Sequence, residues 1–242
     1  IDNPPGILYA RGNQAVLELP CIAIVGTRRA TPYGLRVTRE LTRDLVRAGF
    51  CIVSGLAYGI DAAAHEAALA AHGNTIAVLA SSLDDESIYP QGNLLLARQI
   101  TSQGGCLISE QTTPTKPFKY QFPLRNRIIS GLSHGTVVVE AQIKSGARIT
   151  AFSALKQNRD VFAVPGSIFS SYSEGTNSLI KEGAKLVTCA QDIIDEFPGL
   201  IEQHKLTDIG KNQSYQPADP QEALLLQNLT SEPKYIDFIL RQ

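Results

Sequence analysis

Short apolar runs alternate along this chain with longer segments of helical periodicity, and this alternation limits it to few folds. Runs such as 21–25 and 136–139 are rich in β-branched residues and carry no charge, which predicts strands buried on both faces of a parallel sheet. Because parallel strands joined through helices need right-handed crossovers, we expect an α/β fold with a Rossmann-like, doubly wound and mostly parallel sheet. The expected strands are residues 21–25, 51–54, 75–79, 106–109, 136–140, 161–164 and 185–187.

Helical patterns and turn residues separate these expected strands. Leu35, Leu41 and Leu45 form one apolar stripe, which ends at Gly49. Gly73 is the expected C-cap of an alanine-rich helix over residues 60–71. Further helices are expected at residues 93–103, 128–132, 147–157 and 177–182.

Composition divides the chain into successive parts. Residues 1–19 are expected to be a lead-in with a short strand at 7–9, and residues 20–198 the Rossmann-like domain. A polar linker is expected at 199–220. Residues 221–242 carry two helical patterns, which fit the start of a helix-turn-helix or winged-helix unit and fit a bare helical hairpin equally well.

Bulk charge indicates no partner, because the net charge is only −1. The 4 cysteines contain no C-x-x-C pair and are expected to be buried thiols in a reducing compartment. The sequence shows neither a secretory signal pattern nor an apolar run of membrane-spanning length. We therefore expect a cytoplasmic protein without a membrane partner.

Basic and aromatic residues gather in an acid-free stretch, residues 111–139. Cations interleaved with aromatic side chains suit phosphate pairing combined with base stacking. The stretch is expected to be a loop before the helix at 128–132, at the carboxyl edge of the sheet, where open α/β sheets bind ligands. Its cations and rings are Lys116, Phe118, Lys119, Tyr120, Phe122, Arg125 and Arg127.

Small or functional residues also end the other expected strands. A single glycine there usually makes a tight turn, but several at one edge, beside acid-free segments at 19–39 and 141–159, predict a phosphate-bearing ligand. A dinucleotide cofactor is less well supported, because the chain has no G-x-G-x-x-G pattern and the second strand lacks an acid to hold a ribose. The strand-end residues are Gly26, Ser54-Gly55, Glu110, Glu140 and Pro165-Gly166.

We expect no catalytic residue, metal site or cofactor. The 4 histidines share no metal-ligand spacing, and His65 lies in an alanine-rich helix, where a packed and hydrogen-bonded histidine is expected. Asp61 and Glu140 are the candidate acid/base residues. Asp61 also suits the first turn of a helix, and Glu140 can simply accept from neighbouring backbone. The sequence shows no recognisable Ser-His-Asp triad or Cys-His pair for nucleophilic catalysis.

Several longer motifs lie at the expected strand ends. They are Gly26-Thr27-Arg28-Arg29 with Tyr33-Gly34, Ser54-Gly55-Leu56-Ala57-Tyr58-Gly59-Ile60-Asp61, Tyr89-Pro90, Phe122-Pro123-Leu124-Arg125-Asn126-Arg127-Ile128-Ile129-Ser130-Gly131-Leu132-Ser133, Ser145-Gly146-Ala147 and Pro165-Gly166. Together they resemble the DprA/Smf family of bacterial DNA-processing proteins, over residues 7–197. The resemblance implies a homodimer without catalytic activity that binds and protects single-stranded DNA (ssDNA) and loads the RecA recombinase during natural transformation.

The resemblance also implies a set of DNA contacts. Arg28 and Lys119 match positions that contact ssDNA phosphates, and Phe122 matches a position near a base. The full set of expected DNA-binding residues is Arg28, Arg29, Ser54, Gly55, Lys119, Phe122, Arg125, Asn126, Arg127, Lys144, Ser145 and Gly146.

Two features of the motifs leave roles open. Arg125 or Arg127 can support the pocket by pairing with Asp61 or Glu140 instead of touching DNA. Where the family often has Ser-Gly-Ser, this chain has Ala147 as the third residue, which removes one hydroxyl donor from a possible phosphate contact.

Two functions other than DNA binding remain as alternatives. Residues 133–140 loosely resemble the G-G-x-G-T-x-x-E stretch of Rossmann-like nucleotide phosphoribohydrolases, in which the Glu is catalytic. Here Ser133-His134 replaces the double glycine, which weakens the expected phosphate nest. The second alternative is a nucleotide-sensing module without a role on DNA.

Overall fold

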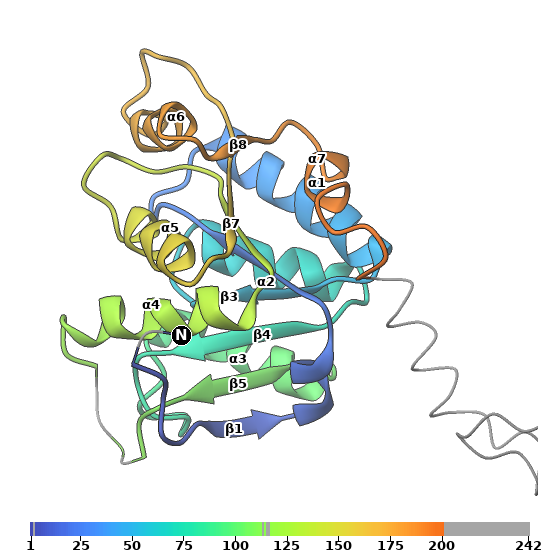
Figure 1. Ribbon diagram of the computed structural model, residues 1–242. Helices are drawn as coiled ribbons and strands as arrows, with labels where there is room; N and C mark the ends of the chain where they lie inside the picture. Colours follow the sequence, from blue (N-terminus) through green and yellow to red (C-terminus); the bar gives the residue numbers. More distant parts are fainter. Residues whose placement is uncertain (2, 113, 115–116, 201–242) are drawn as a thin grey trace, which may run out of the picture. The chain divides into compact units, whose positions relative to one another are not determined.

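One sheet of eight strands runs through the computed structural model, which describes residues 1, 3–112, 114 and 117–200 (Figure 1). The strand order is β1-β5-β4-β3-β2-β6-β7-β8, in which β1 is antiparallel to β5 and every other pair is parallel. The predicted α/β fold with a mostly parallel sheet is confirmed. The strands are β1 (Tyr9–Gly12), β2 (Cys21–Val25), β3 (Cys51–Ser54), β4 (Thr75–Leu79), β5 (Cys106–Ser109), β6 (Gly135–Val138), β7 (Asp160–Ala163) and β8 (Lys185–Leu186).

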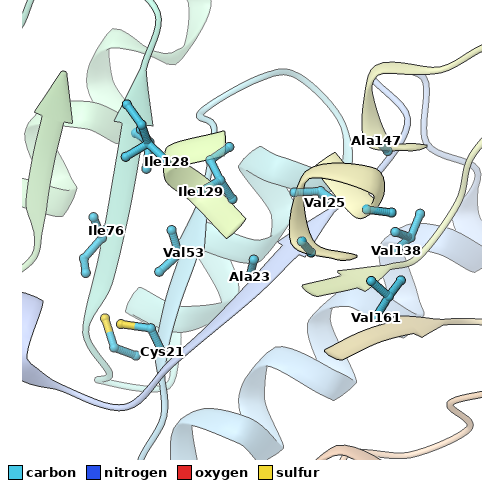
Figure 2. Packing of buried hydrophobic residues seen from close by; sticks show 14 of the residues in the cluster. Cys21, Ala23, Val25, Val53, Ile76, Ile128, Ile129, Val138, Ala147 and Val161 are labelled. Carbon is cyan, nitrogen blue, oxygen red and sulfur yellow. The ribbon is translucent and has the colours of Figure 1, made fainter. Parts of the chain in front are cut away.

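Helices cover both faces of this sheet. The helices are α1 (Pro32–Ala48), α2 (Ile60–Ala70), α3 (Leu94–Ser102), α4 (Gln121–Leu132), α5 (Gly146–Lys156), α6 (Glu174–Lys181) and α7 (Gln191–Ile194), with short 3-10 turns η1 (Gln14–Glu18) and η2 (Gln91–Asn93). Because successive strand residues point to opposite faces, Ile22 and Ile24 pack against α1 and α2, whereas Ala23 and Val25 pack against α4 and α5. Figure 2 shows the second of these cores, with Ile129 of α4 among the strand side chains.

The order of the strands reverses at β2. From β2 the chain continues through β3 and β4 to β5 on one side, then returns to place β6, β7 and β8 on the other side. The loops after β2 and β6 therefore diverge at the carboxyl edge, and open α/β sheets bind ligands at such a point. This position was expected from the strand-end residues.

Helix α4 corrects the predicted basic loop. The helix begins at Gln121, not at residue 128, so Phe122, Arg125 and Arg127 are helical residues. Proline is typical of loops, but Pro123 lies in the first turn of α4. Backbone N–H groups there have no partner within a helix, so a proline is tolerated.

The first residues of the chain add an edge strand to the sheet, so the predicted lead-in packs on the main domain. Their strand is Tyr9–Gly12, later than the predicted residues 7–9, and it pairs with β5 as an edge strand. Gly12 has φ 112°, and a side chain there would collide with the carbonyl oxygen of Gly105. This close approach explains why the strand ends at a glycine.

The end of α2 also differs from the prediction. His72 takes the left-handed position, with φ 55°, and its N–H donates to Leu69 O. Gly73 follows it, and its N–H donates to Ala68 O at 2.9 Å. This is the Schellman arrangement with histidine at the position where glycine is usual. Gly73 is instead needed for packing, because a Cβ would collide with Val46.

Parts of the predicted organisation lie outside the described residues. These are residues 201–242, which hold most of the predicted linker and the whole predicted helical segment. Within the described part, no helix combines the length and the apolar character needed to cross a membrane.

Candidate nucleic-acid interface

An arginine lies over a phenylalanine ring at the carboxyl edge of the sheet. Arg28 is exposed in the loop after β2, and its guanidinium carbon is 5.1 Å from the centre of the Phe122 ring. Tyr89, in the loop after β4, contacts the same ring at 5.6 Å between centroids and an interplanar angle of 57°. Residues from three distant segments thus form one cation-aromatic surface, the kind of surface that accepts a base and its phosphate.

This surface borders a small pocket that is open to solvent. Its walls come from the loops that follow β2, β3 and β4 and from the first turns of α4. The lining residues are Arg28, Gly55, Ala57, Tyr58, Tyr89, Pro90, Phe122 and Arg125. Arg28, Gly55, Phe122 and Arg125 were predicted site residues, and the structure brings all four together.

Tyr58 and Tyr89 were not predicted as site residues. Both rings are about half exposed, at 49% and 47%, so their aromatic faces are available beside Phe122. Both tyrosines stand in the motifs that resemble the DprA/Smf family, and both follow strands that end at the carboxyl edge. An aromatic residue shortly after a buried parallel strand was the signal that could have found them.

Arg125 holds the pocket together from inside. Its side chain is buried, and Nη1 donates to Gly55 O at 2.7 Å and to Val78 O. Burial lowers the pKa of Arg125 to about 10, and the nearby carboxylate of Asp61 opposes this shift. Arg125 therefore remains charged at neutral pH and joins α4 to the ends of β3 and β4. Its Nε and Nη1 donate to the protein, so a direct contact with DNA, which stays a prediction, would fall to Nη2.

Asp61 completes this arrangement below Arg125. Its carboxylate accepts from Gly55 N–H at 3.1 Å and from Ala57 N–H at 3.4 Å, in the first turn of α2. Burial raises the pKa of Asp61, whereas the charge of Arg125 and the two backbone donors lower it. The two side chains form no ion pair within 4 Å, so Arg125 influences Asp61 through its charge at longer range. Through Oδ2, Asp61 shapes the loop after β3.

Glu140 is also tied to the protein. It is buried, and its carboxylate accepts from Thr31 N–H at 2.9 Å and from the Thr31 hydroxyl at 2.5 Å. A Cβ on Gly34 would collide with the same carboxylate, so only glycine fits there. Of the two roles expected for Glu140, acid/base residue or hydrogen-bond acceptor from neighbouring backbone, the structure shows the second. Through Thr31, the side chain of Glu140 thus holds the loop that carries Arg28.

Lys119 is exposed just before α4. It stands between Phe118 and Tyr120, whose rings stack at 5.9 Å with an interplanar angle of 7°. Within the described part of the chain Lys119 forms no ion pair. Its charge is therefore available for a phosphate.

Arg127 is different, because it already has a partner. Its Nη2 lies 2.6 Å from Glu110 Oε1, and both side chains are largely covered. An arginine neutralised by a carboxylate is a weak ligand for a phosphate. The structure places Arg127 in an ion pair at the end of β5, and its contact with a DNA phosphate stays a prediction.

The remaining predicted residues divide into buried and exposed groups. Ser54 is fully buried and donates to Ile24 O at 2.6 Å, and buried Asn126 donates to Gly146 O at 3.3 Å. Both side chains therefore connect elements of the fold: Ser54 joins β3 to β2, and Asn126 joins α4 to the start of α5. Arg29, Lys144 and Gly146 are exposed. None of the last three residues, nor Ser145, lines the pocket around Arg28.

Metal and histidine chemistry is not supported in the described residues. No cluster of three or more His, Cys, Asp or Glu side chains there could hold a metal ion. His65 is fully buried and lies 2.7 Å from the Thr75 hydroxyl, which itself donates to Ile52 O. The hydroxyl therefore accepts from His65 Nδ1–H, and the ring is neutral. Burial lowers the pKa of His65 to about 3. The predicted packed, hydrogen-bonded histidine is confirmed.

Known proteins share this fold and these motifs. The family model of DNA recombination-mediator protein A matches residues 1–198. The DNA processing protein DprA of Bacillus subtilis (strain 168) is 48% identical over 82% of this chain, and Protein Smf of Escherichia coli (strain K12) is 43% identical over 97%. The chain spans 66% and 63% of the length of these two relatives.

A solved structure gives the same result for the fold. DNA processing protein A from Helicobacter pylori, described for its single-stranded DNA binding mode, superposes with a TM-score of 0.74 at 36% identity. The match covers 81% of this chain and 88% of that one. A family model over most of the chain, close relatives and a shared fold agree with one another. The chain belongs to the DNA recombination-mediator protein A family.

Proposed function

We propose that this protein binds ssDNA at the carboxyl edge of its sheet and acts as a recombination mediator. The observation that carries the proposal is Arg28 lying over the ring of Phe122 at the mouth of a pocket, with Lys119 exposed nearby. Phosphates would pair with the two cations, while a base stacks on the aromatic surface. The ssDNA binding described for the Helicobacter pylori relative supports the same activity.

The binding experiment compares ssDNA with duplex DNA. Fluorescence anisotropy of a labelled dT oligomer should show binding that weakens as salt increases, because phosphate contacts release counterions. Duplex DNA of equal length should bind this site more weakly, because its bases are already stacked and paired. Equal affinity for both forms, unaffected by Phe122→Ala, contradicts the proposal.

The finer parts of the function concern partners and place in the cell. We infer that the protein forms a homodimer in the cytoplasm and helps RecA to assemble on ssDNA, for which the family membership is the support. Light scattering tests the dimer at micromolar concentration. A RecA strand-exchange assay on ssDNA coated with a single-strand binding protein tests loading: a rate unchanged by this protein contradicts it.

We propose no catalytic activity. The phosphoribohydrolase alternative needs a free catalytic carboxylate after β6, and Glu140 instead accepts two hydrogen bonds from Thr31. Incubation with nucleoside monophosphates should release no free base. Release of base that Glu140→Gln abolishes would support the enzyme over the binding protein. A nucleotide-sensing module would bind mononucleotides as tightly as oligomers, which the same anisotropy assay measures by competition.

A further inference from the structure

A second pocket lies at the same edge of the sheet, beneath the beginning of α4. It is larger than the pocket beside Arg28. Its walls come from the ends of β4 and β5, from α4 and from Asn3. The lining residues are Asn3, Leu79, Ala80, Glu110, Gln111, Gln121, Leu124, Arg125, Arg127 and Ile128. Only Arg125 and Arg127 among these residues belong to the expected DNA-binding set.

The chemistry of this pocket suits a neutral, flat and polar-edged group. Leu124, which is 50% exposed, offers aliphatic surface, whereas Ile128 is buried. The amide of Gln111 can donate and accept, and no other described side chain or backbone group bonds to it. An apolar wall with a few polar groups is typical of a small-ligand site.

Charge in this pocket is already balanced. Arg127 is paired with Glu110 at 2.6 Å, and buried Arg125 lies within the electrostatic influence of the Asp61 carboxylate. Arg127 nevertheless keeps two covered nitrogens, Nε and Nη1, for which the described residues supply no acceptor. The unpaired N–H groups of such an arginine can donate to carbonyl oxygens or ring nitrogens. Its attraction for a phosphate is weak, because the paired carboxylate offsets its charge. A nucleobase has such acceptors and no charge.

The two pockets are separated only by the first turns of α4. Phe122 lines the pocket beside Arg28, whereas Gln121 and Leu124 line the second one. Arg125 lines both pockets. A strand whose phosphates lie near Lys119 can therefore place successive bases on the two sides of the same helical turn.

We propose that the second pocket receives another base of the bound ssDNA, with Leu124 against its face and Gln111 and Arg127 at its edge. The inference rests on the proposed function, because it adds a base subsite to the same DNA site. It assigns Arg127 to base contact and not to phosphate contact. The footprint on DNA is then longer than one stacked nucleotide.

The test uses two oligomers of about 16 nucleotides, within the range of site sizes of ssDNA-binding domains. One is dT, and the other has the same phosphates but abasic sugars. Leu124→Ala should weaken binding of dT about tenfold, equivalent to about 1.4 kcal/mol. It should change binding of the abasic oligomer by less than about twofold, because the contact is to a base. Gln111→Ala should weaken dT binding about threefold through one lost hydrogen bond.

Controls separate this inference from the proposed function. Leu95→Ala, on α3 and 70% exposed, lies outside both pockets and should leave both affinities unchanged. If the wild-type protein binds neither oligomer, the proposed function fails. If wild type binds and Phe122→Ala weakens dT binding, but Leu124→Ala and Gln111→Ala bind dT like wild type, only the second pocket is refuted. Equal losses on dT and abasic oligomers also refute it.

Discussion

Alanine at Lys119 and at Phe122 should weaken ssDNA binding in two distinguishable ways. Lys119 is exposed and forms no ion pair within the described residues, so its alanine variant removes a charge and little packing. Phe122 carries no charge, and its ring contacts Arg28 and Tyr89. Its alanine variant removes a stacking surface and leaves every phosphate contact in place.

The magnitudes follow from the physics of each contact. Loss of one phosphate contact should reduce the slope of log affinity against log salt by about 0.7, so between 50 and 200 mM salt the gap between wild type and Lys119→Ala should shrink about two- to threefold. Loss of a stacked base should cost about 1–3 kcal/mol, or about five- to 160-fold in Kd, at every salt concentration. In a plot of log affinity against log salt, Lys119→Ala should therefore give a flatter line than wild type. Phe122→Ala should give a line parallel to that of wild type.

Because Arg28 and Phe122 are in contact, the effects of substituting them on ssDNA binding should depend on each other. Their separation of 5.1 Å is within cation-π range, worth about 0.5–1 kcal/mol at an exposed site. Removing the ring also frees the guanidinium, so Arg28→Ala and Phe122→Ala should not be additive. A double variant should lose less binding free energy than the sum of the two single variants, by about that amount.

The assay is anisotropy of a labelled dT oligomer at several salt concentrations, with a melting curve for each variant. Phe122 is followed by a proline, and a mere packing role predicts a lower melting temperature with equal losses for all ligands. A destabilised Phe122→Ala with an altered salt slope would refute the division between stacking and charge. Wild-type affinity in Lys119→Ala would refute it as well.

Three further predictions concern the framework of the site. His65 has a pKa lowered to about 3 in the folded state, below its ordinary value near 6.5, so the unfolded chain binds the extra proton. Stability should fall by up to about 1.4 kcal/mol per pH unit as pH drops below about 6, and urea midpoints should show a flatter dependence in His65→Gln. Gly34→Ala should cost about 1–3 kcal/mol, because its Cβ collides with Glu140, whereas Gly146→Ala, whose Cβ meets nothing within 4 Å, should leave the urea midpoint nearly unchanged or raised. Arg125→Ala should cost about 3–5 kcal/mol by leaving the backbone carbonyls of Gly55 and Val78 without their buried charged donor, and Arg125→Lys should not restore the melting temperature, since a lysine lacks the planar fork.

Much of the sheet was predictable because its strands are buried on both faces. Strands β2 to β5 have the predicted bounds, since each is an apolar run stopped by small or polar residues. The family resemblance is confirmed by the comparisons. The start of α4 was missed because Pro123 and neighbouring aromatics are typical of loops, and local sequence does not show that the proline falls in a first turn.

The roles within the site were less accessible from sequence. Arg125 and Arg127 are two residues apart in one motif, yet Arg125 bonds to backbone carbonyls of β3 and β4 loops and Arg127 pairs with Glu110. Which arginine is engaged depends on partners distant in the chain. Tertiary geometry also determines that Phe122 meets Arg28. The cations and the ring of Phe122 were therefore predictable, whereas the rings of Tyr58 and Tyr89 and the separate role of each arginine were not.

The ends of the sheet limit how two copies can associate. Among the described residues the last strand on one side is β1, with four residues, and on the other it is β8, with two. Strands this short offer few unpaired backbone groups to another chain, which is a common way in which proteins prevent edge-to-edge aggregation. A homodimer of this protein should therefore not continue the sheet from one subunit into the next. It should form through side chains on helices and loops, and single substitutions there should be able to separate the subunits without unfolding them.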